Sequence, residues 1–204
     1  MPILKQGAAP PPSEVILNRT AQHRATLSAT FALTLVVVQV AALRLVPWEP
    51  AVRVILPATI AGVPLALWTY RRWAGTWVVF VGLAANLAVI LANGGLMPIQ
   101  HATVVEAIGQ EQAAQYAPGE WIGGSKDVLV TRGHLTPLGD GIVVHLGSGG
   151  FVASPGDVVV WSGLLILAAE ASVAWQRRTR PRRNPLVAPP STQGATKAEG
   201  GAAT

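Results

Sequence analysis

The sequence has 204 residues, half of them hydrophobic and only 12% charged, whereas a soluble domain carries roughly a quarter charged residues. It contains no cysteine, which excludes disulfides, thiolate metal sites and cysteine nucleophiles. Its basic excess would suggest nucleic acid in a soluble protein. Here the arginines lie beside apolar blocks, which indicates a membrane protein with no nucleic-acid partner.

Four apolar blocks follow one another along the chain, and each is long enough for a helix to cross the hydrocarbon core. Residues 1–26, which are proline-rich and then basic, are interpreted as a flexible or surface-lying cytoplasmic leader. Pro57 and Pro64 should kink the second block, and Arg71-Arg72 forms a basic turn after it. The predicted spans are residues 27–46, 51–70, 73–93 and 158–175.

The segment between the third and fourth spans, residues 94–157, is also predicted to fold. Apolar residues at helical spacing favour a short amphipathic helix between Pro98 and Tyr116. The β-branched stretches 127–131 and 142–146 predict a small hairpin, to which Phe151-Val152 would add. Since so small a sheet is not stable alone, it should pack on the helix ends or on a second protein. The expected fold class is mainly α: a four-helix transmembrane bundle with a small extracytoplasmic α+β segment, a short helix plus a β-hairpin, between helices 3 and 4.

The distribution of basic residues predicts the orientation. With four spans, both termini and the Arg71-Arg72 turn lie on one side, and this side holds most of the lysines and arginines. The positive-inside rule places it in the cytoplasm, so residues 94–157, in which acids outnumber cations, are extracytoplasmic. Residues 177–204 begin with a basic run and continue as a Pro-, Ala- and Gly-rich tail that is expected to be disordered.

Three short stretches are candidates for function, although a local structural role explains each. Asn93-Gly94-Gly95 can stop a helix in a left-handed turn, or can let the backbone approach a ligand. Asp140-Gly141 can form the tip of a turn in which the aspartate bonds its own backbone. Ser154-Pro155-Gly156-Asp157 has the spacing of a helix N-terminal cap.

Polar side chains inside the spans are few. Glu170 is an intramembrane acid, which is a functional candidate by default. Its position near the cytoplasmic interface also allows it to reach the headgroup region or to pair with Arg177 or Arg178. Gln39 and Asn86 are expected to form hydrogen bonds between helices.

The sequence gives little support for catalysis or for a cofactor. His101, His134 and His145, with Asp127 and Asp140, could ligate a metal, but their spacing matches no ligand pair. There is no phosphate-binding glycine loop, and no nucleophile–base pair stands at diagnostic spacing. We therefore expect no metal, no cofactor and more likely no enzymatic activity.

Three motifs occur in order along the chain: Asn93-Gly94-Gly95-Leu96-Met97-Pro98, Leu135-Thr136-Pro137-Leu138-Gly139-Asp140 and Ser154-Pro155-Gly156-Asp157. Over about residues 28–176, this arrangement resembles an uncharacterised family of small bacterial multi-pass membrane proteins, a domain of unknown function with N-G-G-x-M-P, L-x-x-L-G-D and S-x-G-D motifs. The resemblance implies the plasma membrane of a bacterium and no particular activity. It marks one joint set of residues: Asn93, Gly95, Met97, Pro98, Lys126, Asp140 and Asp157.

The predicted topology brings members of this set together. Asn93 ends the third span, Asp157 begins the fourth, and Asp140 lies at the expected hairpin tip between them. We hypothesise that these three residues converge near the outer membrane surface, with Lys126 as their countercharge.

Three functions are compatible with these features. The first is an accessory or scaffold protein in the lipid bilayer, whose outer segment docks a membrane protein partner or a second copy of the chain. The second is a membrane-interface enzyme or small-ligand sensor that uses Asp140, Asp157 and Lys126, on a lipid-linked or cationic substrate. The third is a transporter subunit, which is weakened by the scarcity of polar side chains in the spans.

Overall fold

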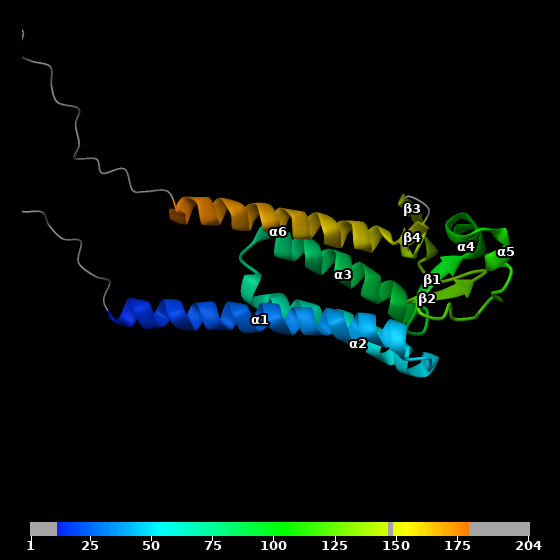
Figure 1. The fold of residues 1–204 in the computed structure, drawn as a ribbon, viewed down its shortest axis with the longest axis horizontal. Helices are drawn as coiled ribbons and strands as arrows, with labels where there is room; N and C mark the ends of the chain where they lie inside the picture. The colour runs from blue at the N-terminus through cyan, green and yellow to red at the C-terminus, as the bar shows by residue number, and fades with distance from the viewer. Residues whose placement is uncertain (1–11, 147–148, 180–204) are drawn as a thin grey trace, which may run out of the picture.

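A computed structural model describes residues 12–146 and 149–179. Four long helices run along a common axis, and the chain between the last two of them folds into a small unit at one end (Figure 1). These helices are α1 (Pro12–Leu45), α2 (Glu49–Leu67), α3 (Ala74–Ala92) and α6 (Pro155–Thr179). The predicted fold class, mainly α with a small α+β segment between the third and fourth spans, is confirmed.

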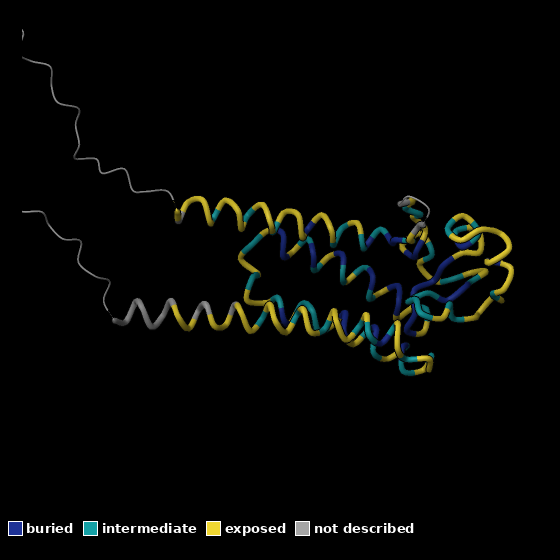
Figure 2. Tube along the Cα trace, viewed as in Figure 1, coloured by how far each residue is buried: buried dark blue, intermediate teal, exposed yellow. Residues whose placement is uncertain are grey.

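Among the described residues, four helical segments are long and apolar enough to cross a membrane: Thr26–Leu45, Glu49–Tyr70, Ala74–Ala92 and Pro155–Arg177. They coincide closely with the four predicted spans, and by this length and composition the chain is a multi-pass membrane protein. A short 3-10 helix, η1 (Trp68–Tyr70), completes the second span before the Arg71-Arg72 turn. The surfaces of α1 and α6 are mostly exposed (Figure 2), and their exposed side chains are largely apolar, which suits contact with lipid.

Helix α1 begins at Pro12, so it overlaps the segment predicted as a leader, residues 1–26. Between Ser13 and Leu45 the sequence has neither glycine nor another proline, so nothing interrupts the helix, and proline is tolerated in a first turn. Residues 1–11, and the part of the predicted tail after Thr179, lie outside the described residues.

Helices α3 and α6 pack closely because glycines line their contact. A Cβ added to Gly82 would lie 2.7 Å from the carbonyl oxygen of Gly156, and one added to Gly163 would lie 2.6 Å from the backbone nitrogen of Val79. A Cβ on Gly75 would likewise meet the backbone of α6. Small residues of this kind let membrane helices approach to backbone contact. The α3–α6 pair is therefore held at a fixed distance.

Glu170 joins the same two helices at their other end. Its carboxylate accepts hydrogen bonds from the backbone N–H groups of Ala74 (2.9 Å) and Gly75 (3.1 Å), at the start of α3. Trp73, the N-cap residue of α3, makes no side-chain hydrogen bond to the first turn of this helix. Glu170 of α6 accepts the free N–H groups instead. Glu170 thus makes a capping contact with α3.

We call residues 93–154, between α3 and α6, the cap. The cap contains two short helices, α4 (His101–Ile108) and α5 (Gln110–Ala113), and one 3-10 turn, η2 (Thr136–Leu138). Its strands are β1 (Met97–Gln100), β2 (Asp127–Val130), β3 (Ile142–Leu146) and β4 (Gly149–Ala153).

The strand pairing differs from the predicted hairpin of 127–131 with 142–146. Strand β2 pairs in parallel with β1, Met97 opposite Asp127, and β3 pairs antiparallel with β4. The prediction missed β1 because it has four residues, one of them a proline, and carries no alternating pattern. The helix and a hairpin are present as expected, but the hairpin is β3–β4.

An apolar core fixes the cap on the helix ends. Buried side chains from α2, α3, β1 and β2 form one cluster, which contains Val52, Leu56, Ile60, Val89, Ile90, Leu96, Met97 and Val128. Because strands and spans share this core, the charged residues of the cap hold fixed positions relative to the bundle.

Candidate functional site

Lys126, directly before β2, is the centre of a group of charged side chains where the cap meets the spans. Its Nζ lies 2.8 Å from Oδ2 of Asp157 and 3.2 Å from Oδ1 of Asp140. Asp127, the first residue of β2, contributes a third carboxyl group. We call Lys126, Asp127, Asp140 and Asp157 the charged cluster. The structure thus brings together three members of the predicted set, Lys126, Asp140 and Asp157.

Asp140 occupies a different environment from the one predicted. It is no hairpin tip: its side chain is fully buried, and its backbone N–H donates to the carbonyl oxygen of Pro98 at 3.1 Å. Gly139 allows this approach, since a Cβ there would lie 2.6 Å from the same carbonyl oxygen. The local sequence around Asp140 resembles an exposed turn, and only the distant contact with β1 buries it.

Asp157 is held by a capping box and by α3. Its N–H donates to Oγ of Ser154 at 3.0 Å, and its Oδ2 accepts the N–H of Ser154 at 3.1 Å. These two hydrogen bonds confirm the predicted N-terminal capping of the helix. Asn86 of α3 donates to Oδ1 at 2.7 Å and accepts from the Ser154 hydroxyl at 2.8 Å. The expected inter-helix hydrogen bonding of Asn86 is therefore observed, and its partner belongs to the charged cluster.

Asp127 and Asp140 form a buried pair of acids. Both oxygens of Asp140 and Oδ1 of Asp127 are buried without a hydrogen-bond partner among the described groups. Burial, followed by the adjacent charge of Asp127, raises the pKa of Asp140 to about 8, and burial likewise raises the pKa of Asp127. Two buried carboxyls this close do not both ionise readily, so we expect the pair to hold one proton at neutral pH.

Lys126 remains positively charged in this setting. Burial alone would lower its pKa, but the carboxylates of Asp140, Asp157 and Asp127 outweigh burial and raise it above the ordinary lysine value. With one proton on the acid pair, two carboxylates face one ammonium group. The charged cluster therefore keeps a net negative charge of about one.

The remaining members of the predicted set have other positions. The side chain of Asn93 binds the backbone N–H and carbonyl of His134 (2.9 and 2.8 Å), not the charged cluster. Gly94 and Gly95 have φ of 73° and 97°, which confirms the predicted helix stop, and a Cβ on Gly95 would collide with the carbonyl of Arg53. Met97 and Pro98 are buried in β1.

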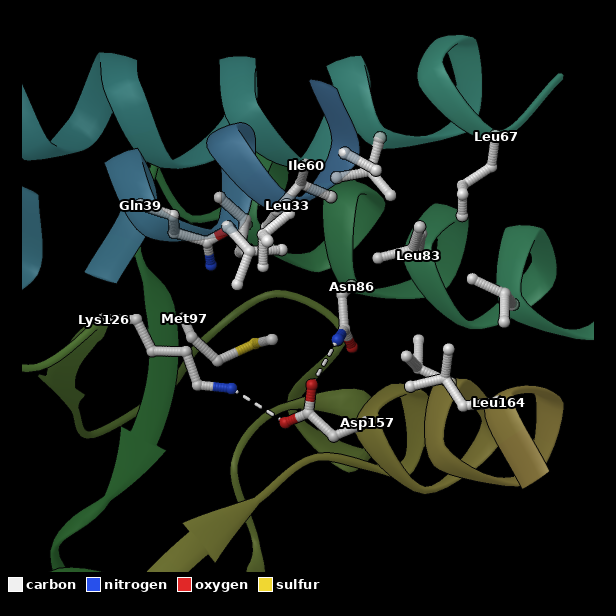
Figure 3. Close-up of a pocket in the computed structure, with 16 residues that line it drawn as sticks. Leu33, Gln39, Ile60, Leu67, Leu83, Asn86, Met97, Lys126, Asp157 and Leu164 are labelled. Carbon is white, nitrogen blue, oxygen red and sulfur yellow. Dashed lines mark hydrogen bonds and ion pairs between the residues drawn. The ribbon is translucent and has the colours of Figure 1, made fainter. Parts of the chain in front are cut away.

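A cavity of about 380 Å³ extends from the charged cluster between the four spans (Figure 3). Side chains of α1 and α2 face those of α3 and α6 across it, and most of them are aliphatic. Polar groups gather at one end. They are Gln39, Asn86, Lys126 and Asp157, with Met97 beside them.

The three histidines considered as metal ligands are all exposed. Within residues 12–146 and 149–179, no group of three or more His, Asp or Glu side chains could hold a metal ion. The charged cluster instead offers hydrogen bonding, a fixed ammonium group and a proton site.

Comparison with the profiles of protein families shows to which family the chain belongs. The profile of a family of unknown function, DUF5317, matches residues 21–169. The chain belongs to this family. Comparison with the curated proteins and with the solved structures gave no match. The DUF5317 region contains the cap and the whole charged cluster, so the predicted resemblance to a domain of unknown function is confirmed.

The acid pair makes a testable prediction about pH. A carboxyl whose pKa is raised on folding binds its proton more tightly in the folded state. Its stabilising contribution is full below the ordinary carboxyl pKa and is lost as the pH rises towards about 8. The groups that face Asp140 are Lys126, Asp127 and Asp157. We expect the melting temperature to fall by several degrees between pH 6 and pH 9.

Asp140→Asn should remove most of this dependence, because an amide resembles the protonated acid. Glu111→Gln, at an exposed residue of α5, is the matched control and should leave the dependence unchanged. An Asp140→Asn protein whose melting temperature still falls as steeply as that of the wild type would show that another group is responsible.

Proposed function

We propose that this member of DUF5317 is a binding protein, not an enzyme, that holds a small amphiphilic molecule between its spans in the plasma membrane of a bacterium. The observation that carries the proposal is the cavity, which is aliphatic along most of its length and polar only at the end where Gln39, Asn86, Lys126 and Asp157 lie. An apolar slot with a few fixed polar groups at one end matches a molecule with a tail and a head.

The dimensions of the cavity suit such a molecule. Its volume of about 380 Å³ lies within the usual range of small-ligand sites, roughly 300–1,000 Å³. Along α3 its lining runs from Val79 to Ile90, which corresponds to about 16 Å of helix. This length is about half of a hydrocarbon core of roughly 30 Å, so a tail would reach about the middle of the bilayer.

A ligand could enter from the membrane itself. On α1 the lining residues Leu33 and Val36 are 63% and 46% exposed, and on α6 Leu164 is 49% exposed. These side chains contact both the cavity and the lipid-facing surface. The cavity is therefore accessible from the bilayer between α1 and α6, as a lipid-soluble ligand requires.

Other roles have less support. The acids that an enzyme would use are tied to Lys126, Ser154 and Asn86, and the hydroxyl of Ser154 donates to Asn86 instead of to a base. Docking of a protein partner on the cap, our first expectation from the sequence, rests on no specific surface, since the apolar face of the cap already packs on α2 and α3. A transporter would need a polar path through the spans, and the far end of the cavity is aliphatic.

The site can be tested by filling it. Leu164 lines the cavity, whereas its neighbour Leu165 is 72% exposed and does not. We expect the wild type and Leu165→Trp, purified in lipid nanodiscs, to retain a small amphiphile that native mass spectrometry detects, and Leu164→Trp to lose it. Val36→Trp and Val37→Trp form a second matched pair on α1. The same ligand occupancy in all four variants, or none in the wild type, would refute the proposal.

The charge distribution supports an orientation with both termini in the cytoplasm and the cap outside. Because the chain has no cysteine, single-cysteine variants report accessibility without background. We expect a membrane-impermeant maleimide to label Gln112→Cys in α5 on intact cells, and to label Arg72→Cys only after permeabilisation. Both side chains are exposed, so the reverse pattern would invert the topology.

A further inference from the structure

The charge of the cavity's polar end defines the head group of the ligand. This step rests on the proposed binding function and names its chemical class. This end is lined by Gln39, Asn86, Lys126 and Asp157, whereas Asp127 and Asp140 do not line the cavity. Lys126 and Asp157 belong to the charged cluster, in which three acids surround one lysine. In the described part of the chain, its ion pairs involve no cation other than Lys126. Even with one proton on the acid pair, an excess negative charge remains beside the cavity.

Lys126 is already committed to neighbouring carboxylates. Its ammonium group contacts Asp157 at 2.8 Å and Asp140 at 3.2 Å, and its side chain is only 22% exposed. An anionic head group would have to share this ammonium with both acids, while it lay against the carboxylate of Asp157. Like charges at such distances in a poorly solvated site repel strongly, so phosphate, sulfate and carboxylate heads are disfavoured.

The side-chain amides of Gln39 and Asn86 have N–H donors at this end, but the charged group with free hydrogen-bonding capacity is an acceptor, the carboxylate of Asp157. Oδ1 of Asp157 accepts one hydrogen bond, from Asn86 at 2.7 Å, and a carboxylate oxygen can accept another. The side-chain carbonyl of Gln39 accepts only a long hydrogen bond, 3.4 Å, from Thr59. Both residues line the cavity and extend into it from opposite walls, from α6 and α1 (Figure 3). Two acceptors beside an excess negative charge favour a donor that is positively charged.

We infer that the cavity takes an amphiphile whose head carries a single positive charge, an alkylamine or alkylammonium, with the head between Asp157 and Gln39 and the tail along the aliphatic walls. Such a head would neutralise the charged cluster. The excess negative charge would attract a cationic head, leave a neutral head unaffected and repel an anionic head. We therefore expect the affinity to fall in the order cationic, neutral, anionic.

Three probes with the same dodecyl tail test this assignment: dodecylammonium, dodecyl maltoside and dodecyl sulfate. Each would be titrated below its micellar concentration into the full-length protein in phosphatidylcholine nanodiscs, with Leu164→Trp nanodiscs as the correction for partition into lipid. We expect the cationic probe to bind the wild type at least tenfold more tightly than the neutral probe, and the anionic probe to bind least.

Asp157→Asn should abolish the preference for the cation while binding of the neutral probe persists. Gln39→Leu, which leaves the capping box intact, should weaken the cationic probe severalfold. Equal affinity of the wild type for the cationic and neutral probes, with both blocked by Leu164→Trp, would overturn the head-group assignment and leave the binding function standing. Binding of no probe above the Leu164→Trp level would overturn the binding function itself. Because the three affinities of the wild type decide the assignment, it can be tested even if Asp157→Asn folds poorly.

Discussion

Replacing Lys126 with methionine is expected to lower the free energy of unfolding by about 3–5 kcal/mol, the usual cost of removing one partner from a buried ion pair. The substitution leaves Asp140, whose side chain is fully buried, and Asp157 without their shared cation. A methionine side chain fills similar space, so the loss would come from charge and not from packing. The ion pair of Lys126 with Asp157 also links the start of β2 to the first turn of α6. Its loss should therefore loosen the cap from the spans.

The measurement is denaturant unfolding of the protein in nanodiscs, with limited proteolysis of the cap as a second observable. Arg132→Met removes a positive charge from an exposed residue of the same segment, and it should change stability by less than about 0.5 kcal/mol. If Lys126→Met were as stable as Arg132→Met, the ion pairs of the charged cluster would contribute nothing to folding.

The second large effect is expected at Gly82, in the contact between α3 and α6. An alanine Cβ there would lie 2.7 Å from the carbonyl oxygen of Gly156 and 2.8 Å from the backbone nitrogen of Val160. Backbone atoms of a packed helix cannot move aside, so the helices must separate, at a cost of about 1–3 kcal/mol. Separation would also pull Asp157 away from Asn86, so any cavity ligand should be lost with the packing.

Gly62→Ala in α2 is the matched control, since the same methyl group would meet only the flexible end of Leu35, at 3.0 Å. There the better helix propensity of alanine should make the change neutral or stabilising by up to about 1 kcal/mol. Unfolding in detergent, followed by far-UV circular dichroism, compares the two variants. Equal stability of Gly82→Ala and Gly62→Ala would mean that the glycine contact does not hold the helices together.

Features that depend on neighbouring residues could be predicted from the sequence. The four spans follow from blocks of about 20 apolar residues. The N-terminal capping box of α6 at Ser154 and the stop of α3 at Gly94-Gly95 follow from residue types at fixed local spacing. The resemblance in motifs also marked Lys126, Asp140 and Asp157, which lie together in the structure although long stretches of chain separate them.

Features that depend on distant contacts could not be predicted. Asp140 has the sequence surroundings of an exposed turn, and only its approach to Pro98 and Lys126 buries it. Strand β1 gives no periodic signal, and its partner β2 follows two helices later. Glu170 caps a helix that begins 96 residues earlier in the chain. In each case the sequence does not show which distant residue the side chain or strand contacts.

The position of Asp157 at the start of α6 has a consequence for biogenesis. The ribosome completes Lys126, Asp127 and Asp140 before it reaches Asp157, yet Lys126 binds a carboxylate from that last helix. In the proposed orientation, with the cap outside, the lysine and its acids would stay hydrated during translocation until α6 had entered the bilayer alongside α3. Asn86 and Ser154 then close around Asp157, so completion of the charged cluster coincides with insertion of the final span. The Lys126–Asp157 ion pair can therefore form only after α6 has been synthesised.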